Sequence, residues 1–401
     1  MMEYLQPDKV LPKEDRLAID HRIRDAINAL GCDAAVAFGI GNFTYATGVG
    51  LPYAEQYVEP RAAVIIPAAP AARRVIVCPF DWEGLVRQQG WAGDVKVYST
   101  IDGTGSAGLT KVLKELCQEK RSIALDFNHT PQQILEDLEA ALPAVKWASL
   151  DVDWCSLRII KTKGEISLLE EAARQSDRGF ISALNHMEGC ALDTLSYSLW
   201  EFTERIRVHV GEFGGSATGH LTTMQGADMQ HYTQPPVGNF VRGNLMRAEV
   251  TNHHYGYWAS GGRTFGVGQQ TSDHQKAYAE NIALKQGAVQ RLCPGAVCSD
   301  IYHAVVEHAA NAGTDLWSEP GMGHGVGVSE REAPFLCPQD TTVLQAGMVI
   351  VLAVYTRGPS GELIVSKDTY QIVEGGSCLL SWYRDWDAFM YQVEGNTARH
   401  G

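Results

Sequence analysis

The chain has 401 residues, with 33 Lys+Arg against 47 Asp+Glu and a formal net charge of −14. This length predicts two domains, and a 45% share of hydrophobic residues excludes a wholly disordered chain. The acidic balance argues against a nucleic-acid or membrane partner, because phosphate surfaces attract Lys and Arg. No apolar run approaches the roughly 20 residues that span a bilayer. Nine scattered cysteines without a C-x-x-C pair, and no signal-peptide layout, predict a cytoplasmic protein with reduced thiols.

The first half of the chain alternates predicted helices and strands. The spacing of apolar residues predicts helices over 16–30, 109–118 and 131–142, and strands over 34–40, 62–66, 74–78 and 122–124. This alternation is typical of an α/β domain. The segment 154–163 leads into a second half of different texture, so we expect domains at 1–155 and 156–401.

The second half opens with a long predicted helix over 164–187. Further helices are predicted over 272–292 and 299–312, and strands over 245–251, 255–259, 348–355 and 369–373. The expected fold class is therefore mixed, α/β (α+β), over both halves.

Four clusters of polar residues are candidates for chemistry: 228–236, 247–264, 321–334 and Arg61 with its neighbours. A lone histidine is more often structural than catalytic, so His231 and His324 are weak signals when taken singly. Glu249 is stronger, because a carboxylate buried in an apolar strand costs several kcal/mol unless it has a partner or a task.

Taken together, these motifs resemble the pita-bread family, which includes methionine aminopeptidase, prolidase, aminopeptidase P and creatinase. The matching segments are 157–161, 243–245, 257–265, 295–301, 323–327 and 347–349, with the His231 loop between the first two. The resemblance implies a pita-bread catalytic domain over 156–401. It also implies a creatinase/prolidase-like N-terminal domain over 1–155.

Metal-dependent members of that family hold two cations with two Asp, one His and two Glu. In register, the five positions are Glu249, Ser260, His324, Ala353 and Lys367. Hard or borderline divalent ions need several oxygen ligands, so we expect no dinuclear site and no cofactor. Lys367 can supply the positive charge instead. A rearranged mononuclear site from Glu249, His324 and either His253 or His254 remains an alternative.

The metal-free members creatinase and ectoine hydrolase are the nearer resemblance, and they cleave C–N bonds in small carboxylate-bearing compounds. Arg331 and Glu332 match an Arg-Glu-Ala motif whose arginine grips the substrate carboxylate in creatinase. Arg61 lies where creatinase has an arginine that reaches the neighbouring subunit, which implies a homodimer; a surface salt bridge is the plainer alternative. Tyr257 and Arg263 are also expected at the substrate.

The sequence therefore predicts a metal-independent hydrolase of a non-peptide amide or amidine bond in a small carboxylate. Glu249 is the expected nucleophile or water-orienting base, His231 the proton shuttle and His324 the donor to the developing oxyanion. Two alternatives stay open, because fold does not determine chemistry. One is a metal-free lyase, decarboxylase or biosynthetic enzyme, and the other is a non-catalytic peptide-binding protein.

Overall fold

A computed structural model describes most of the chain. The described residues are 10–51, 61–91, 93–100, 105–190, 197–212, 217–227, 238–319, 321–381, 387–388 and 390–395. The chain divides into two compact units, Met1–Arg158 with Thr162–Glu165, and Ile159–Lys161 with Ile166–Gly401. The predicted boundary between residues 155 and 156 falls inside helix α8 (Asp151–Ile159).

The N-terminal unit is built on a six-stranded mixed sheet with the order β4-β3-β2-β1-β5-β6. Its strands are β1 (Ala34–Ala37), β2 (Ala63–Pro67), β3 (Val75–Pro79), β4 (Asp94–Tyr98), β5 (Ser122–Leu125) and β6 (Lys146–Ser149). Its helices are α2 (Lys13–Ala29), α3 (Ile40–Thr47), α5 (Glu83–Gln89), α6 (Gly105–Cys117), α7 (Gln132–Ala141) and α8. Helices connect parallel strands, as in α/β layers.

The C-terminal unit holds a nine-stranded sheet. Seven of its strands follow the order β11-β10-β12-β13-β9-β8-β7, and the other two, β14 and β15, pair with β13 and β9. The long strands are β7 (Ala217–Gln225), β8 (Leu245–His254), β9 (Tyr257–Val267), β12 (Val349–Arg357) and β13 (Leu363–Val373). The short ones are β10 (Gly323–Gly325), β11 (Glu332–Phe335), β14 (Gly376–Leu379) and β15 (Gln392–Val393). The mixed fold class predicted from the sequence is confirmed.

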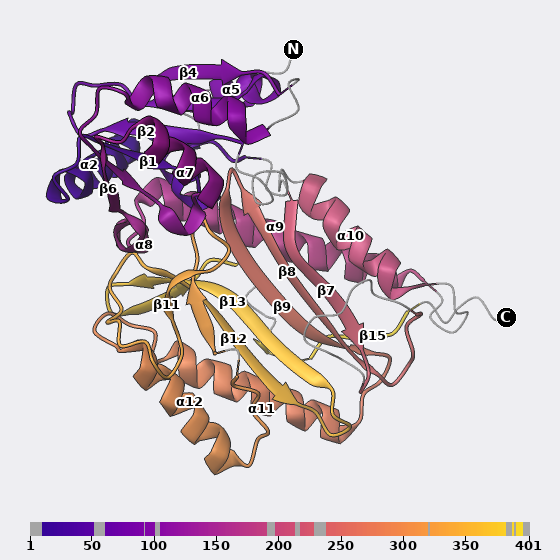
Figure 1. Ribbon diagram of the computed structural model, residues 1–401. Coiled ribbons are helices and arrows are strands. Elements are labelled where there is room, and N and C mark those ends of the chain that lie inside the picture. The colour runs from indigo at the N-terminus through magenta and orange to yellow at the C-terminus, as the bar shows by residue number, and fades with distance from the viewer. Residues whose placement is uncertain are drawn as a thin grey trace. The chain divides into compact units, whose positions relative to one another are not determined.

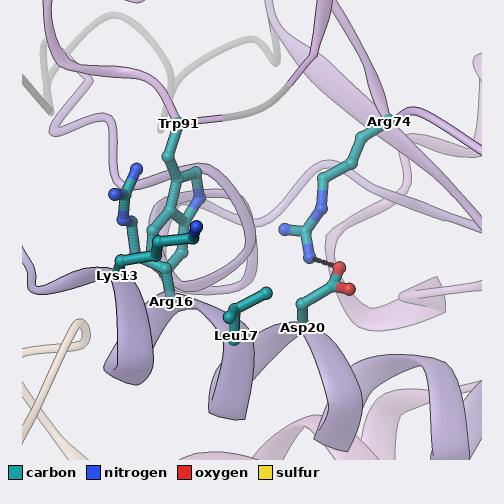
Figure 2. Close-up of a pocket in the computed structure, with 6 residues that line it drawn as sticks. All are labelled: Lys13, Arg16, Leu17, Asp20, Arg74 and Trp91. Carbon is teal, nitrogen blue, oxygen red and sulfur yellow. Dashed lines mark hydrogen bonds and ion pairs between the residues drawn. The ribbon is translucent and has the colours of Figure 1, made fainter. Parts of the chain in front are cut away.

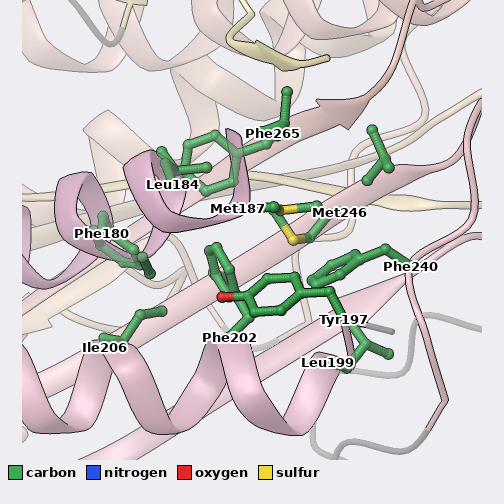
Figure 3. Packing of buried hydrophobic residues seen from close by; sticks show 14 of the residues in the cluster. Phe180, Leu184, Met187, Tyr197, Leu199, Phe202, Ile206, Phe240, Met246 and Phe265 are labelled. Atoms are coloured by element: carbon green, nitrogen blue, oxygen red, sulfur yellow. The ribbon is translucent and has the colours of Figure 1, made fainter. Parts of the chain in front are cut away.

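Four helices pack on this sheet: α9 (Lys163–Glu188), α10 (Leu199–Glu212), α11 (Ser272–Val289) and α12 (Cys298–Ala312) (Figure 1). Helices α9 and α10 pack on β8 and β9, where Phe180 and Phe202 meet Met246 and Phe265 (Figure 3). Helices α11 and α12 pack on β12 and β13 through a second apolar cluster. Side chains alternate between the two faces of a strand, so neighbouring residues on β8, β9 and β13 face either these helices or the opposite side.

No helix among the described residues is long and apolar enough to cross a membrane.

Candidate active site

The candidate site lies along one row of residues that crosses four strands of the C-terminal sheet. Glu249 on β8 pairs with Gly262 on β9, Gly262 pairs with Lys367 on β13, and Lys367 pairs with Ala353 on β12. Cross-strand partners share a face of the sheet. The register therefore brings the first-Asp and both Glu positions of the family pattern side by side.

Glu249 is fully buried and is held by three groups on the same face. The Lys367 ammonium lies 3.5 Å from its Oε2, the Arg247 guanidinium lies 3.5 Å from its Oε1, and the Tyr355 hydroxyl donates a 2.7 Å hydrogen bond to Oε2. Burial alone would raise the pKa of Glu249, but Lys367 and Arg247 outweigh it and lower the pKa to about 2. Glu249 is thus an ionised carboxylate and a weak base at neutral pH.

Gly262 permits this ion pair, because a side chain on β9 would stand between its two members. A Cβ at this position would lie 3.0 Å from Glu249 Cγ and 3.0 Å from Lys367 Cβ. Such contacts are tighter than ordinary packing, so the neighbouring side chains would have to move. The absent side chain lets carboxylate and ammonium approach across the intervening strand.

His324 lies on β10 with its side chain mostly buried. Its Nδ1 is 2.9 Å from the Gly325 carbonyl oxygen, which can only accept, so Nδ1 carries the proton and Nε2 has a lone pair. Burial lowers the pKa of His324 to about 3, so the ring is neutral at physiological pH. This tautomer can accept a proton or hydrogen bond through Nε2. It does not suit the predicted role of His324 as donor to an oxyanion.

Glu330 lies beside this cluster, in the loop between β10 and β11. Its carboxyl hydrogen-bonds Thr251, and burial raises its pKa although Lys367 acts in the opposite direction. The Thr251 hydroxyl in turn lies 2.8 Å from that of Ser260. A carboxyl whose pKa moves toward neutrality is better placed than Glu249 for proton transfer.

Arg263 lies on the opposite, helix-covered face of the sheet, because it follows Gly262 on β9. Its guanidinium donates to the backbone carbonyls of Gly262 and Lys367, at 2.8 and 2.6 Å, and pairs with Asp368. The side chain is only 4% exposed. The geometry therefore favours a structural role, and strand alternation explains why Arg263 does not face the site where a substrate contact was predicted.

The other expected substrate contacts differ in their surroundings. Glu332 is buried and its Oε1 lies 2.8 Å from Lys161 Nζ, so this carboxylate takes part in an internal ion pair. Tyr257 is buried at the first position of β9. Arg331 is exposed, and its charge is felt at both His324 and Glu330. Of the three, Arg331 is the side chain that the geometry leaves open to solvent.

His231 lies outside the described residues, so its role as proton shuttle stays a prediction. Arg61 belongs to the N-terminal unit, where it lies 3.5 Å from Asp81 and stacks on Trp82 with 5.1 Å to the ring centroid. These contacts place the guanidinium beside an aromatic ring and in an ion pair at the surface of the unit, because the Asp81 side chain is 56% exposed. The homodimer and the role of Arg61 in a partner's site stay predictions.

A pocket of about 240 Å³ lies within the N-terminal unit. Figure 2 shows its lining, with Lys13, Arg16, Leu17 and Asp20 on α2 facing Arg74 and Trp91. Asp20 pairs with both Arg24 and Arg74, and these charges lower its pKa although burial acts to raise it. The charge of this carboxylate is therefore balanced by two arginines, and the pair resembles a structural ion pair more than a catalytic group.

The metal centre that the resemblance implies does not fit the residues present. Its five positions hold one carboxylate, one hydroxyl, one imidazole, one methyl group and one ammonium. Divalent ions bind oxygen, nitrogen and thiolate donors, whereas a methyl group donates nothing and an ammonium repels a cation. In the described part of the chain, no group of three or more His, Cys, Asp or Glu side chains is arranged to hold a metal ion.

Three residues around the site were not predicted from the sequence. Arg247, Tyr355 and Glu330 were not singled out as site residues, although all three surround the Glu249–Lys367 pair. A signal for Arg247 was available, because strand alternation places it on the same face as Glu249. Tyr355 and Glu330 come from distant segments, and nothing in their local sequence points to Glu249.

Two family models cover most of the chain. The model described as metallopeptidase family M24 matches residues 167–374, and the creatinase/prolidase N-terminal domain matches residues 21–160. These matches do not distinguish the metal-free members of the family from the metal-dependent ones.

Named relatives and solved structures agree with the family models. The chain is 22% identical to an Xaa-Pro dipeptidase of Lactobacillus delbrueckii subsp. lactis, over 72% of this chain and 78% of the relative. The solved Xaa-Pro dipeptidase of Bacillus anthracis superposes with a TM-score of 0.77 at 17% identity, over 94% of this chain and 99% of that one. The prolidase of Pyrococcus horikoshii OT3 gives 0.75 at 18%, over 91% and 98%. At these identities the superpositions speak for the fold alone.

The predicted activity on a non-peptide amide or amidine bond is wrong, because the similar named proteins are Xaa-Pro dipeptidases and prolidases. The error came from reading the loss of metal ligands as a change of substrate. The residues at the metal-ligand positions determine how the substrate carbonyl is polarised, but they do not determine which type of C–N bond is cleaved. The expectation of a hydrolase is confirmed at the level of the peptidase family.

Proposed function

The chain belongs to metallopeptidase family M24, and from that premise we propose that it hydrolyses the peptide bond of short peptides of the dipeptide class. The named relatives that match most of its length carry dipeptidase names. The observation that carries the proposal is the buried Glu249–Lys367 pair, which stands at the centre of the family's catalytic sheet. This pair supplies a charged, water-poor surface against which a carbonyl group can be polarised.

We propose that Lys367 is the electrophile of the reaction. An ammonium has three N–H donors, and the described contact of Lys367 Nζ is the carboxylate of Glu249 at 3.5 Å. The side chain is 10% exposed, so a substrate carbonyl can reach the ammonium while bulk water is largely excluded. Glu249 and the Tyr355 hydroxyl hold the charge in place. The chemistry in this proposal is metal-independent.

Proton transfer falls to Glu330 in this proposal. In its ionised form Glu330 accepts a proton from the water that attacks the carbonyl carbon, and the acid so formed returns that proton to the leaving nitrogen. The C–N bond breaks as the carbonyl reforms, with Lys367 unchanged throughout. Arg331, exposed at the same end of the site, would pair with the carboxylate terminus of the peptide. His231 remains the alternative proton carrier.

A panel of dipeptides tests the proposal, with Xaa-Pro and non-proline members assayed by mass-spectrometric detection of released amino acids. Turnover of at least one member is expected in the presence of a chelator, and Glu330→Gln should reduce it by about 100-fold. The surface variant Lys276→Met is the matched control, because Lys276 is exposed on α11. If turnover requires added Mn²⁺, the proposed peptidase activity would stand, but the proposed metal independence would be refuted. Lack of turnover in both conditions would refute the function.

We also propose that the protein works in the cytoplasm. All nine cysteines are unpaired, from Cys32 in the N-terminal unit to Cys378 on β14. Unbridged thiols of this number suit a reducing compartment. Localisation of a tagged chain by microscopy or fractionation is the check, and an exported product would contradict it.

A further inference from the structure

The five positions at which metal-dependent relatives hold their cations lie on neighbouring strands of the C-terminal sheet. One of them, Lys367, carries a positively charged side chain in this chain. Lys367 stands on β13 between Gly262 on β9 and Ala353 on β12. Its ammonium reaches across the glycine to Glu249, which is the only carboxylate among the five. The ammonium thus lies within the cluster that a metal ion would need.

Both oxygens of Glu249 lie near a positive charge, but among the described residues only Oε2 accepts a hydrogen bond. Oε2 accepts the hydrogen bond of Tyr355 at 2.7 Å and faces Lys367 at 3.5 Å, while Oε1 faces Arg247 at 3.5 Å. Arg247 and Glu249 are essentially inaccessible to solvent. A metal ion at either oxygen would therefore lie beside one of these two positive charges, which oppose its binding.

The local charges also oppose a divalent ion. The cluster holds the cations Lys367 and Arg247 against the carboxylate of Glu249, with the Glu330 carboxyl group at its edge. Like charges a few ångströms apart repel each other, and the repulsion on a divalent ion is twice that on a monovalent one. The Ser260 hydroxyl, 2.8 Å from Thr251, offers no compensating charge.

We infer that this centre excludes divalent cations and that the Lys367 ammonium is its resident positive charge, which binds the carbonyl oxygen of the substrate. The exclusion of divalent ions rests on the contacts and charges of the described residues. The binding of a carbonyl oxygen rests on the proposed peptidase function. The two parts are tested separately, so that failure of one is distinguishable from failure of the other.

Metal titration tests the exclusion without any substrate. The full-length protein is freed of metal with a chelator and titrated with Mn²⁺, Co²⁺ or Zn²⁺ by calorimetry, with bound metal measured after dialysis. Wild type should retain well below one equivalent. A variant with Ser260→Asp, Ala353→Glu and Lys367→Glu should bind at least about 100-fold more tightly, because it restores three oxygen ligands. Lys276→Met should behave as wild type.

A single variant protects the test against misfolding of the triple one. Lys367→Glu alone removes the ammonium and sets a second carboxylate beside Glu249 and His324. If circular dichroism shows that the triple variant is unfolded, the single variant should bind more tightly than wild type, by about tenfold or more. Stoichiometric metal in wild type, or equal affinity in wild type and a folded Lys367→Glu variant, would overturn the exclusion.

Chemical rescue tests the carbonyl contact. Lys367→Ala should lose dipeptide turnover, and added ethylammonium should restore part of it, because the small cation can occupy the space left by the side chain. Tetramethylammonium, which has no N–H donor, should not. Rescue by both cations, or by neither while wild type is active, would refute the proposed contact. Absence of activity in wild type would refute the peptidase function and leave the metal result standing.

Discussion

Two charge clusters stand back to back on the C-terminal sheet, and they differ in how completely their charges are matched. On the helix-covered face, Arg263 and Lys285 meet Asp368 and Asp177, with Lys285 Nζ at 2.5 Å from Asp368 and 2.6 Å from Asp387. On the other face, the Glu249–Lys367 contact is 3.5 Å long. Adjacent residues on β9 and β13 supply both clusters, so strand alternation alone assigns each side chain to its face.

The difference indicates which cluster holds the fold and which one is available for chemistry. Lys285 contacts two carboxylates at 2.5 and 2.6 Å and Arg263 pairs with Asp368, so the buried charges of this cluster are matched by opposite charges. The ammonium of Lys367 has a longer contact with one carboxylate and a side chain that is 10% exposed. A charge held in place but incompletely satisfied is available to a ligand.

The largest expected effect is on the helix-covered face. Asp368→Ala would leave Arg263 and Lys285 buried without their shared carboxylate, and breaking a buried pair in this way costs about 3–5 kcal/mol of unfolding free energy. Urea denaturation followed by fluorescence measures it. A loss below 1 kcal/mol would show that this cluster is not structural.

Lys367→Met is expected to have the opposite effect, with a large loss of activity and a small loss of stability. Turnover of a dipeptide substrate should fall by about 100-fold or more, as for the loss of an oxyanion donor. Glu249 keeps Arg247 and Tyr355, so the urea midpoint should change much less than for Asp368→Ala. Loss of folding with Lys367→Met would place this lysine in the structural cluster instead.

Gly262→Ala sharpens the comparison at the strand shared by both faces. The added methyl group would crowd Glu249 Cγ and Lys367 Cβ, each 3.0 Å away, and should cost about 1–3 kcal/mol of stability. Turnover should fall as well, because the ion pair is pushed apart. Gly211→Ala is a suitable control, because a Cβ added at Gly211 has open space. Gly256 in the β8–β9 turn is not suitable, because its φ of 81° strains any residue with a side chain.

The smallest expected effect is a pH dependence on the site face. His253 packs against Trp258 and accepts a 3.2 Å hydrogen bond from the Gly256 amide, and burial lowers its pKa to about 4. Between pH 6.5 and 4 the unfolded chain binds a proton that the folded chain does not, so stability falls as pH decreases through this window. The loss at pH 5 should be roughly 1–2 kcal/mol. Urea midpoints at pH 7 and 5 measure it, and His253→Gln should flatten the difference.

Much of the fold was predictable from local pattern. The long helix predicted over 164–187 is α9, and the strand predicted over 348–355 overlaps β12 (Val349–Arg357), because burial imposes a periodicity on helix and strand alike. Strand β13 begins at Leu363, six residues before the predicted strand at 369. The added segment includes Lys367, whose charge broke the apolar pattern. β10 and β11 were missed because they are short and rich in glycine or proline.

Taken alone, the sequence determined the family pattern and the loss of acidic side chains at Ala353 and Lys367, because motif order survives when individual residues change. Only the tertiary structure decided that Lys367 meets Glu249 across Gly262 and that Arg263 points to the opposite face. These contacts join residues about 100 positions apart. The register of paired strands determines such contacts, and no local pattern in the sequence contains it.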